Sequence, residues 1–148
     1  MLKDILARLG GDDLTRAGTL IGRTAEFDSS VSGLSTDRPA EWRWSFARAP
    51  QSLTAEILDS SGTVVARPAV ALDASGTLQW DGRLADGSRA PDGAYVLRLS
   101  ARDSAGTALA ADMTSLGRIQ EVMSREGELW AGFGSVALPL AKLVWIAA

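Results

Sequence analysis

The sequence predicts an all-β fold preceded by one short helix. From Glu41 onward, apolar and polar residues alternate in short runs, which is the pattern of strands with one buried face. Turn-forming Asp, Gly and Pro residues separate these runs at short intervals. Apolar residues at helical spacing occur at the start of the chain. With 148 residues and 46% hydrophobic content, the chain can build a core.

The N-terminal segment, residues 1–13, is predicted to begin with an amphipathic helix. Its apolar residues recur at i, i+3, i+4 and i+7, and the pair Gly10 and Gly11 ends the pattern. A helix this short is marginal in water without a partner, which is either its own domain or another subunit. We assign a candidate subunit contact to this N-terminal stripe, which consists of Leu2, Ile5, Leu6 and Leu9.

The next segment is expected to lead from this helix into the first strand. Asp12 or Asp13 can cap a second short helical turn that Gly22 ends. Residues 23–27 then have the composition of a strand. Residues 28–39 are polar, rich in Ser and contain Gly, which is typical of a linker or long loop and predicts a domain boundary there.

The central region, residues 39–112, is predicted to form a β-sandwich. The form Asp-x-x-Gly recurs at residues 59–62, 73–76 and 103–106, and each copy is expected to form a turn. Short strands with regular turn signals indicate an immunoglobulin or fibronectin type III sandwich, and the absence of Cys favours the latter. The alternating apolar residues are Trp42, Trp44 and Phe46; Leu53, Ala55 and Ile57; Leu78 and Trp80; and Tyr95, Leu97, Leu99 and Ala101.

The last part of the chain is predicted to form a small, strongly curved barrel. Glycines and Pro139 join its short strands, and Pro139 should lie at an edge or bend because it cannot donate a backbone hydrogen bond. Trp130 and Trp145 are expected to fill the interior. The predicted strands are residues 117–123, 128–133, 135–138 and 142–146.

The composition argues against catalysis and cofactor binding. Without His or Cys the chain lacks imidazole bases, thiolate nucleophiles and the common zinc ligand sets. A Ser nucleophile would need Lys3 or Lys142 as its base, and neither lies in a recognisable motif. Asp81, Asp86 and Asp92 suit turns better than a calcium loop because their spacing differs from that of an EF-hand. We therefore assign no catalytic, metal-binding or cofactor-binding residue, and expect no cofactor.

Charge and hydrophobicity bear on the partners. A net charge of −3 and a pI near 4.9 provide no attractive field for nucleic acid. No apolar run is long enough to span a bilayer, and the N-terminus does not have the pattern of a cleaved signal peptide. We therefore expect neither nucleic-acid binding nor membrane insertion.

Several short motifs follow one another in a recognisable order. They are AGTLIGRT (17–24), WDG (80–82), DG (86–87), PDGAY (91–95), GRI (117–119) and VAL (136–138). Each motif alone is weak, but their order is more specific. This order resembles that of the bacterial flagellar hook-cap family, also called hook-assembly or basal-body rod modification proteins, and the resemblance extends from about Leu14 to the C-terminus.

The resemblance implies a fold and a function. The fold is a fibronectin type III-like sandwich, residues 39–112, inserted into a small Tudor-like barrel that residues 14–38 and 113–148 form. The function is a non-enzymatic scaffold that caps the growing flagellar hook and promotes polymerisation of the hook subunit. The implied partners are the hook subunit and further copies of the chain, in a homo-oligomeric cap.

The resemblance also implies a location, and the chain differs from the family in the length of its N-terminal region. Family members act at the distal end of the growing hook, so the chain is expected to be cytoplasmic before export and to leave without a cleaved signal peptide. They usually carry a longer region ahead of the LIG segment than the nineteen residues seen here. The sequence is therefore either a fragment or a short relative.

One alternative function comes from a different class. The chain could be a β-sandwich binding module, carbohydrate-binding or secretion-associated, of an exported protein. This alternative predicts that Trp42 or Trp44 is exposed as a stacking platform, and that residues 20–24 do not pair with the C-terminal strands. Because Trp42 and Trp44 share a strand face with Phe46, a core role for them is favoured.

Overall fold

The structure is a computed structural model that describes residues 17–133 and 136–147. Within these residues the fold is all-β, as predicted, with two single-turn 3₁₀ helices, η1 (Gly18–Leu20) and η2 (Leu140–Lys142). The turn η1 lies where a second helical turn was expected, and Gly22 follows it with a φ of 91°. The predicted helix in residues 1–13 lies outside the described residues.

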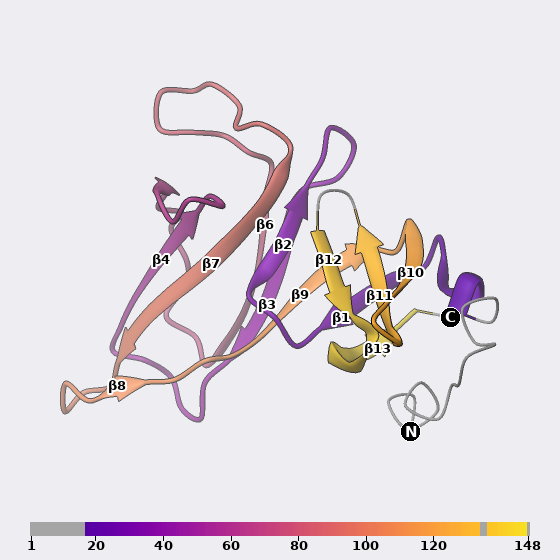
Figure 1. The fold of residues 1–148 in the computed structure, drawn as a ribbon. Helices are drawn as coiled ribbons and strands as arrows, with labels where there is room; N and C mark the ends of the chain where they lie inside the picture. Colours follow the sequence, from indigo (N-terminus) through magenta and orange to yellow (C-terminus); the bar gives the residue numbers. More distant parts are fainter. Residues whose placement is uncertain (1–16, 134–135, 148) are drawn as a thin grey trace.

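The strands of the described residues form three sheets (Figure 1). The shared sheet contains, in spatial order, β13 (Leu143–Ile146), β1 (Thr24–Phe27), β9 (Asp112–Arg118), β3 (Ala40–Ser45) and β6 (Ser75–Trp80). The second sheet contains β2 (Val31–Leu34), β7 (Gly93–Arg102), β4 (Ser52–Leu58) and β5 (Val64–Ala66), with β8 (Ala108–Leu109) paired to β7. The third sheet contains β10 (Glu121–Arg125), β11 (Glu128–Phe133) and β12 (Val136–Pro139).

Strand β9 connects the two halves of the molecule. Its first part pairs with β3, from Asp112 opposite Ser45 to Leu116 opposite Glu41. Its last part pairs with β1, from Ser115 to Arg118. The shared sheet therefore runs without interruption from β6 in the central region to β13 near the C-terminus, as the ribbon shows (Figure 1).

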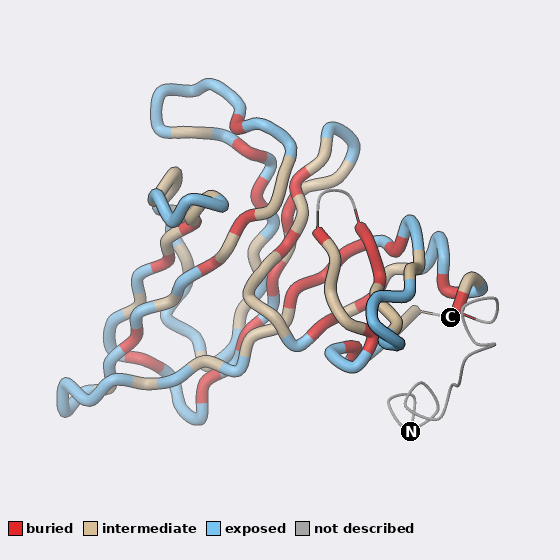
Figure 2. Tube along the Cα trace, viewed as in Figure 1, coloured by how far each residue is buried: buried red, intermediate tan, exposed pale blue. Residues whose placement is uncertain are grey.

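Two hydrophobic cores lie on this framework. The central core lies between the shared and second sheets, and its large side chains include Trp42, Trp44, Phe46, Ile57, Trp80, Tyr95 and Leu97. The terminal core combines both ends of the described chain and contains Leu20, Phe27, Ile119, Phe133 and Leu143. Figure 2 shows the buried residues along the strands and the exposed residues concentrated in the connecting loops. The predicted alternation in β3, β4 and β7 is confirmed.

The prediction of a linker at residues 28–39 was wrong. This segment contains β2, which pairs with β7 along its full length. Its polar residue Ser32 is fully buried. The Ser32 hydroxyl donates to the Leu116 carbonyl (3.2 Å) and accepts from the Glu41 amide (3.0 Å), and these bonds replace those to water. A strand within a Ser-rich segment can therefore lie inside the fold when its buried hydroxyl bonds to neighbouring backbone.

Two of the three predicted Asp-x-x-Gly turns form. Gly62 and Gly106 have positive φ, and the side chains of Asp59 and Asp103 accept hydrogen bonds from amides two and four residues further on. The third prediction was wrong, because Gly76 belongs to β6. A Cβ on Gly76 would lie 2.6 Å from Cζ2 of Trp44, so this glycine makes room for the indole ring.

The C-terminal strands differ from prediction at one point. The predicted strand 117–123 is two strands, since the chain turns a corner between β9 and β10. Ile119, in the corner, donates its amide to the Arg23 carbonyl and accepts from the Gly22 amide. Pro139 ends β12, an edge strand of the third sheet, as predicted. The other three predicted strands correspond to β11, β12 and β13.

The two C-terminal tryptophans do not fill the interior as predicted. Trp145 is 52% exposed. Trp130 is half-buried, and the Arg125 guanidinium lies 4.8 Å from its ring centroid. The terminal core instead contains Phe27 stacked on Phe133, with 5.3 Å between the ring centroids.

Candidate interaction surfaces

The aspartates of the loop between β6 and β7 stabilise turns. The Asp81 carboxylate accepts a hydrogen bond from the Arg83 amide (3.1 Å). The Asp86 carboxylate accepts from both the amide and the hydroxyl of Ser88, which lower the pKa of Asp86 below its ordinary value. Within residues 17–133 and 136–147, no three His, Cys, Asp or Glu side chains are grouped to hold a metal ion. Asp81 and Asp86 thus have the predicted turn role.

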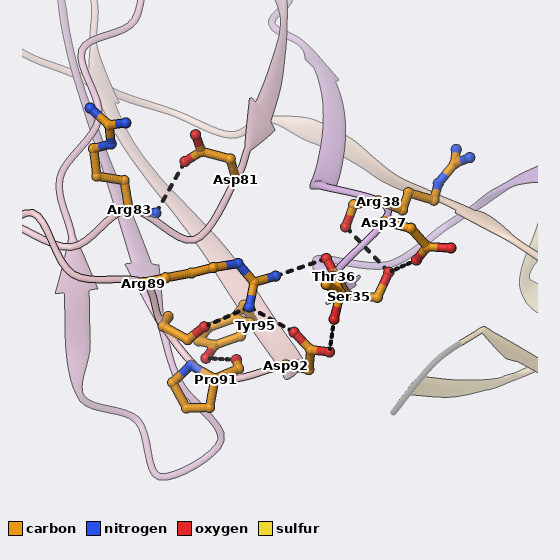
Figure 3. A network of polar contacts seen from close by, with 11 residues as sticks. Ser35, Thr36, Asp37, Arg38, Asp81, Arg83, Arg89, Pro91, Asp92 and Tyr95 are labelled. Carbon is orange, nitrogen blue, oxygen red and sulfur yellow. Dashed lines mark hydrogen bonds and ion pairs between the residues drawn. The ribbon is translucent and has the colours of Figure 1, made fainter.

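Asp92, in contrast, joins two loops (Figure 3). Its carboxylate forms an ion pair with Arg89 (2.8 Å) and accepts a hydrogen bond from the Thr36 hydroxyl (3.1 Å), and the Arg89 contact chiefly lowers the pKa of Asp92. Arg89 also donates to the Ser35 carbonyl (2.8 Å). These contacts tie the loop after β2 to the loop before β7, so the network is a structural clamp.

Tyr95 anchors the same region to the central core. Its hydroxyl donates to the Pro91 carbonyl (2.6 Å), and its ring lies edge-on to Trp80 with 4.8 Å between the centroids. Burial raises the pKa of the Tyr95 hydroxyl. A Tyr near the start of a strand that bonds to the backbone a few residues upstream is a feature of immunoglobulin-like sandwiches.

The two features that would favour a carbohydrate-binding module are both contradicted. Trp42 and Trp44 are 0% and 3% exposed, and the Trp42 indole donates to the Ser30 carbonyl (2.8 Å). They therefore provide no stacking platform. Residues 20–24 lead directly into β1, which pairs with β13: the Thr24 carbonyl accepts from the Ala147 amide, and the next residue, Ala25, lies opposite Ile146.

The other candidate positions are not brought into a site. The N-terminal stripe, Leu2, Ile5, Leu6 and Leu9, lies outside the described residues, as does Lys3. Lys142 is exposed at the end of η2. None of the helices in the described part of the chain is long and apolar enough to cross a membrane.

A surface that the sequence reasoning missed lies on β13. Glu26 of β1 is opposite Trp145 and Phe27 is opposite Leu143, so Val144 is an extra residue, a β-bulge. Leu143 and Ile146 pack on the terminal core, whereas Val144 and Trp145 are 44% and 52% exposed. The sequence pattern that could have indicated this surface is the run of four consecutive apolar residues, 143–146. A four-residue strand has only two residues on its inner face, so two of the four must face outward.

A hollow of about 550 Å³, the outer groove, extends from Val144 across the outer face of the shared sheet. Its charged residues are Glu26, Asp28, Arg43 and Asp112. Arg43 forms an ion pair with Glu26 (2.9 Å), and the Thr114 hydroxyl also donates to Glu26. With three carboxylates and one guanidinium, the outer groove combines an acidic surplus with an apolar end.

Comparison with known proteins identifies the family. The model of the FlgD Ig-like domain matches residues 29–105, which is just over half of the chain and contains β2 to β7. The chain belongs to the FlgD Ig-like domain family. This result confirms the hook-cap family that the order of the motifs predicted, and agrees with the position of Tyr95 in the fold.

Solved FlgD structures share the fold over most of the chain. FlgD from Xanthomonas campestris, whose structure is described as giving insights into the hook capping essential for flagellar assembly, has a TM-score of 0.72 and 22% identity, covering 92% of this chain and 100% of that one. FlgD from P. aeruginosa has a TM-score of 0.68 and 21% identity, covering 86% and 98%. Truncated FlgD from Helicobacter pylori has a TM-score of 0.50 and 19% identity, covering 86% and 94%. No curated protein matches the sequence.

Proposed function

We propose that this chain is a non-enzymatic scaffold that caps the growing flagellar hook and promotes polymerisation of hook subunits. The observation that carries the proposal is membership of the FlgD Ig-like domain family over residues 29–105. The fold of the X. campestris protein, matched over 92% of this chain, is in keeping with that membership.

The proposed partners are the hook subunit and other copies of the chain, at the distal end of the growing hook. The chain reaches that place by export without a cleaved signal peptide and is cytoplasmic before export. It binds no nucleic acid and inserts into no membrane, in keeping with its net charge of −3. The absence of His and Cys from the sequence supports a role without catalysis and without a cofactor.

We propose for the architecture a fibronectin type III-like sandwich, residues 39–112, inserted into a Tudor-like barrel of residues 14–38 and 113–148, after a helical segment of residues 1–13. The central and terminal cores support this division. β2, although it comes from the first barrel segment, adds a strand to the sandwich side through β7.

Deletion of the gene tests the proposed function. Cells without the chain are expected to stop hook growth, and expression of the wild-type chain should restore hooks of normal length in electron micrographs. Addition of the purified chain to purified hook subunit should also speed polymerisation. Normal hooks in the deletion strain would overturn the proposal.

The N-terminal stripe, Leu2, Ile5, Leu6 and Leu9, remains our candidate for a contact between copies. A charge at its centre should prevent association, because Glu cannot be buried in an apolar contact without loss of hydration. Light scattering before and after the substitution Leu6→Glu measures this effect. An unchanged mass would remove the stripe from consideration.

A further inference from the structure

We propose that the outer groove binds the N-terminal stripe of a second copy, so that copies of the chain join head to tail. The inference rests on the self-association in the proposed function and assigns both sides of that contact. One side is the apolar pair Val144 and Trp145 with the carboxylates beside it. The other side is the N-terminal stripe with its flanking charges.

The receiving surface is apolar at one end and acidic beyond it. The bulge in β13 turns Val144 and Trp145 outward together, and Trp145 lies directly opposite Glu26. Asp28 and Asp112 line the outer groove beyond Val144. A partner that covers this surface therefore needs apolar side chains with positive charges beside them.

The N-terminal segment has this combination of residues. If residues 2–9 are helical, successive side chains are about 100° apart around the axis, and the stripe occupies one face. Lys3 and Arg8 then lie about 110° from the centre of the stripe on opposite sides, while Asp4 lies about 150° away. Long basic side chains at the flanks could then reach a surface on which the stripe rests, and Asp4, the carboxylate within residues 2–9, would lie on the far side of the helix.

The position of Ala17 favours a second copy over the chain's own stripe. Ala17 is buried beside η1, where Gly22 bonds to Ile119 just after the last residues of β9. The outer groove contains residues 112–114, at the opposite end of β9, and extends toward β6. Most of the groove thus lies along β9 and β6 away from Ala17, the first residue that the structure describes. A contact between two different surfaces is heterologous and joins copies into a ring or a filament.

Light scattering after size exclusion, with variants that remove one side at a time, tests the contact. Leu6→Glu disrupts the N-terminal stripe, and Trp145→Glu disrupts the surface that receives it. Each substitution is expected to weaken association of the full chain at least about tenfold. The matched control is Leu72→Glu, because Leu72 is 51% exposed but lies outside the outer groove. The control should associate like the wild type, and circular dichroism should show the same strand content in all variants.

An equal mixture of the two variants gives the decisive result. Each has one intact side, so the mixture should form a complex of one Leu6→Glu chain and one Trp145→Glu chain that does not grow further. A mixture that stays monomeric overturns the proposal, and so does wild-type association by Trp145→Glu alone. A third result would also overturn the proposal. If the wild type is monomeric and iodide quenches tryptophan fluorescence more strongly in Leu6→Glu than in the wild type, the stripe docks on its own chain.

The hook assay separates this inference from the proposed function. If the wild-type chain is monomeric at all accessible concentrations but restores hook growth, the head-to-tail contact is wrong and the capping role stands. If cells without the chain build normal hooks, the capping role is wrong whatever the masses show.

Discussion

Gly117 determines how closely β9 approaches the aromatic pair of the terminal core. A Cβ at this position would lie 2.4 Å from Cδ2 of Phe133, whose ring stacks on Phe27. The backbone conformation of Gly117 does not require glycine, because its φ is not positive. The glycine is needed for space, because the Phe133 ring is held by its stacking on Phe27 and β9 is held between β1 and β3.

Substitution of Gly117 by Ala should therefore destabilise the protein. We expect the free energy of unfolding in urea to fall by about 1–3 kcal/mol, because the ring must move within a packed core. Gly93→Ala is the control, since a Cβ added there would have no atom within 4 Å and the φ of Gly93 is not positive. The control should be as stable as the wild type or up to about 1 kcal/mol more stable. Equal losses in the two variants would contradict this account.

The environment of Asp103 makes the free energy of unfolding depend on pH in the acid range. Arg48, at 2.6 Å, and the Thr107 amide hold the pKa of Asp103 below its ordinary value of 3.8. Because the pKa is lower in the folded state, the contribution of Asp103 is fully present above the unfolded pKa and is lost as the pH falls through the folded pKa. Asp103→Asn should thus be less stable than the wild type near neutral pH, and the difference should shrink in acid.

Urea titrations between about pH 6 and pH 2 measure this difference. Asp73→Asn is the control, because residues 73–76 do not form the turn that residues 103–106 form. A difference between the wild type and Asp103→Asn that is independent of pH would refute the proposed role of the charge.

At the scale of elements, the bulge in β13 lets two of its side chains pack on the terminal core while two others are exposed to solvent. Leu143 and Ile146 occupy the two inner positions opposite Phe27 and Ala25. The extra residue, Val144, has no partner in β1. Strand β13 can therefore display two adjacent apolar side chains without removing any from the terminal core.

Deletion of Val144 should leave the fold intact. The remaining residues would pair with β1 in regular register, so the free energy of unfolding should change by less than about 1 kcal/mol. Deletion of Ala25 in β1 is the control, because it would bring Thr24 or Glu26 to a fully buried position. Circular dichroism and urea unfolding distinguish the two. Unfolding of the Val144 deletion would show that the bulge is required for the fold.

How far the sequence predicts these elements depends on whether a residue's role is local. The faces of β3, β4 and β7 follow from alternation, and the turns at Asp59 and Asp103 follow from bonds within five residues. The roles of Gly76, Ser32 and Trp145 depend on strands far away in the sequence. The residues next to them in sequence therefore predicted the wrong structure: a turn, a linker and an interior position. The outer groove was missed for the same reason, because its walls come from five separate strands and their flanking loops.

At the scale of the whole molecule, the central core depends on a strand that the family match does not reach. The match ends at residue 105, whereas β9 begins at Asp112 and pairs with five residues of β3. Without β9, the inner strand β3 becomes an unprotected edge and its tryptophans lose the neighbouring Met113.

A fragment of residues 29–118 should accordingly be more stable than a fragment of residues 29–105. We expect the longer fragment to unfold cooperatively in urea and the shorter one to unfold at a lower concentration or to aggregate, because its β3 edge is open. Tryptophan fluorescence follows both transitions, since Trp42, Trp44 and Trp80 are present in each fragment. Coincident midpoints would show that β9 adds nothing to the central core.

The pairing of β1 also sets the order in which parts of the fold can form during synthesis. β1 is among the first strands to emerge from the N-terminal side, but both of its neighbours, β9 and β13, follow about ninety and about one hundred and twenty residues later. The central sandwich strands, β3 to β7, lie between them and can meet as soon as Arg102 is free. The terminal core closes only when β13 has been synthesised, so the surface formed by Val144 and Trp145 forms after the central sandwich.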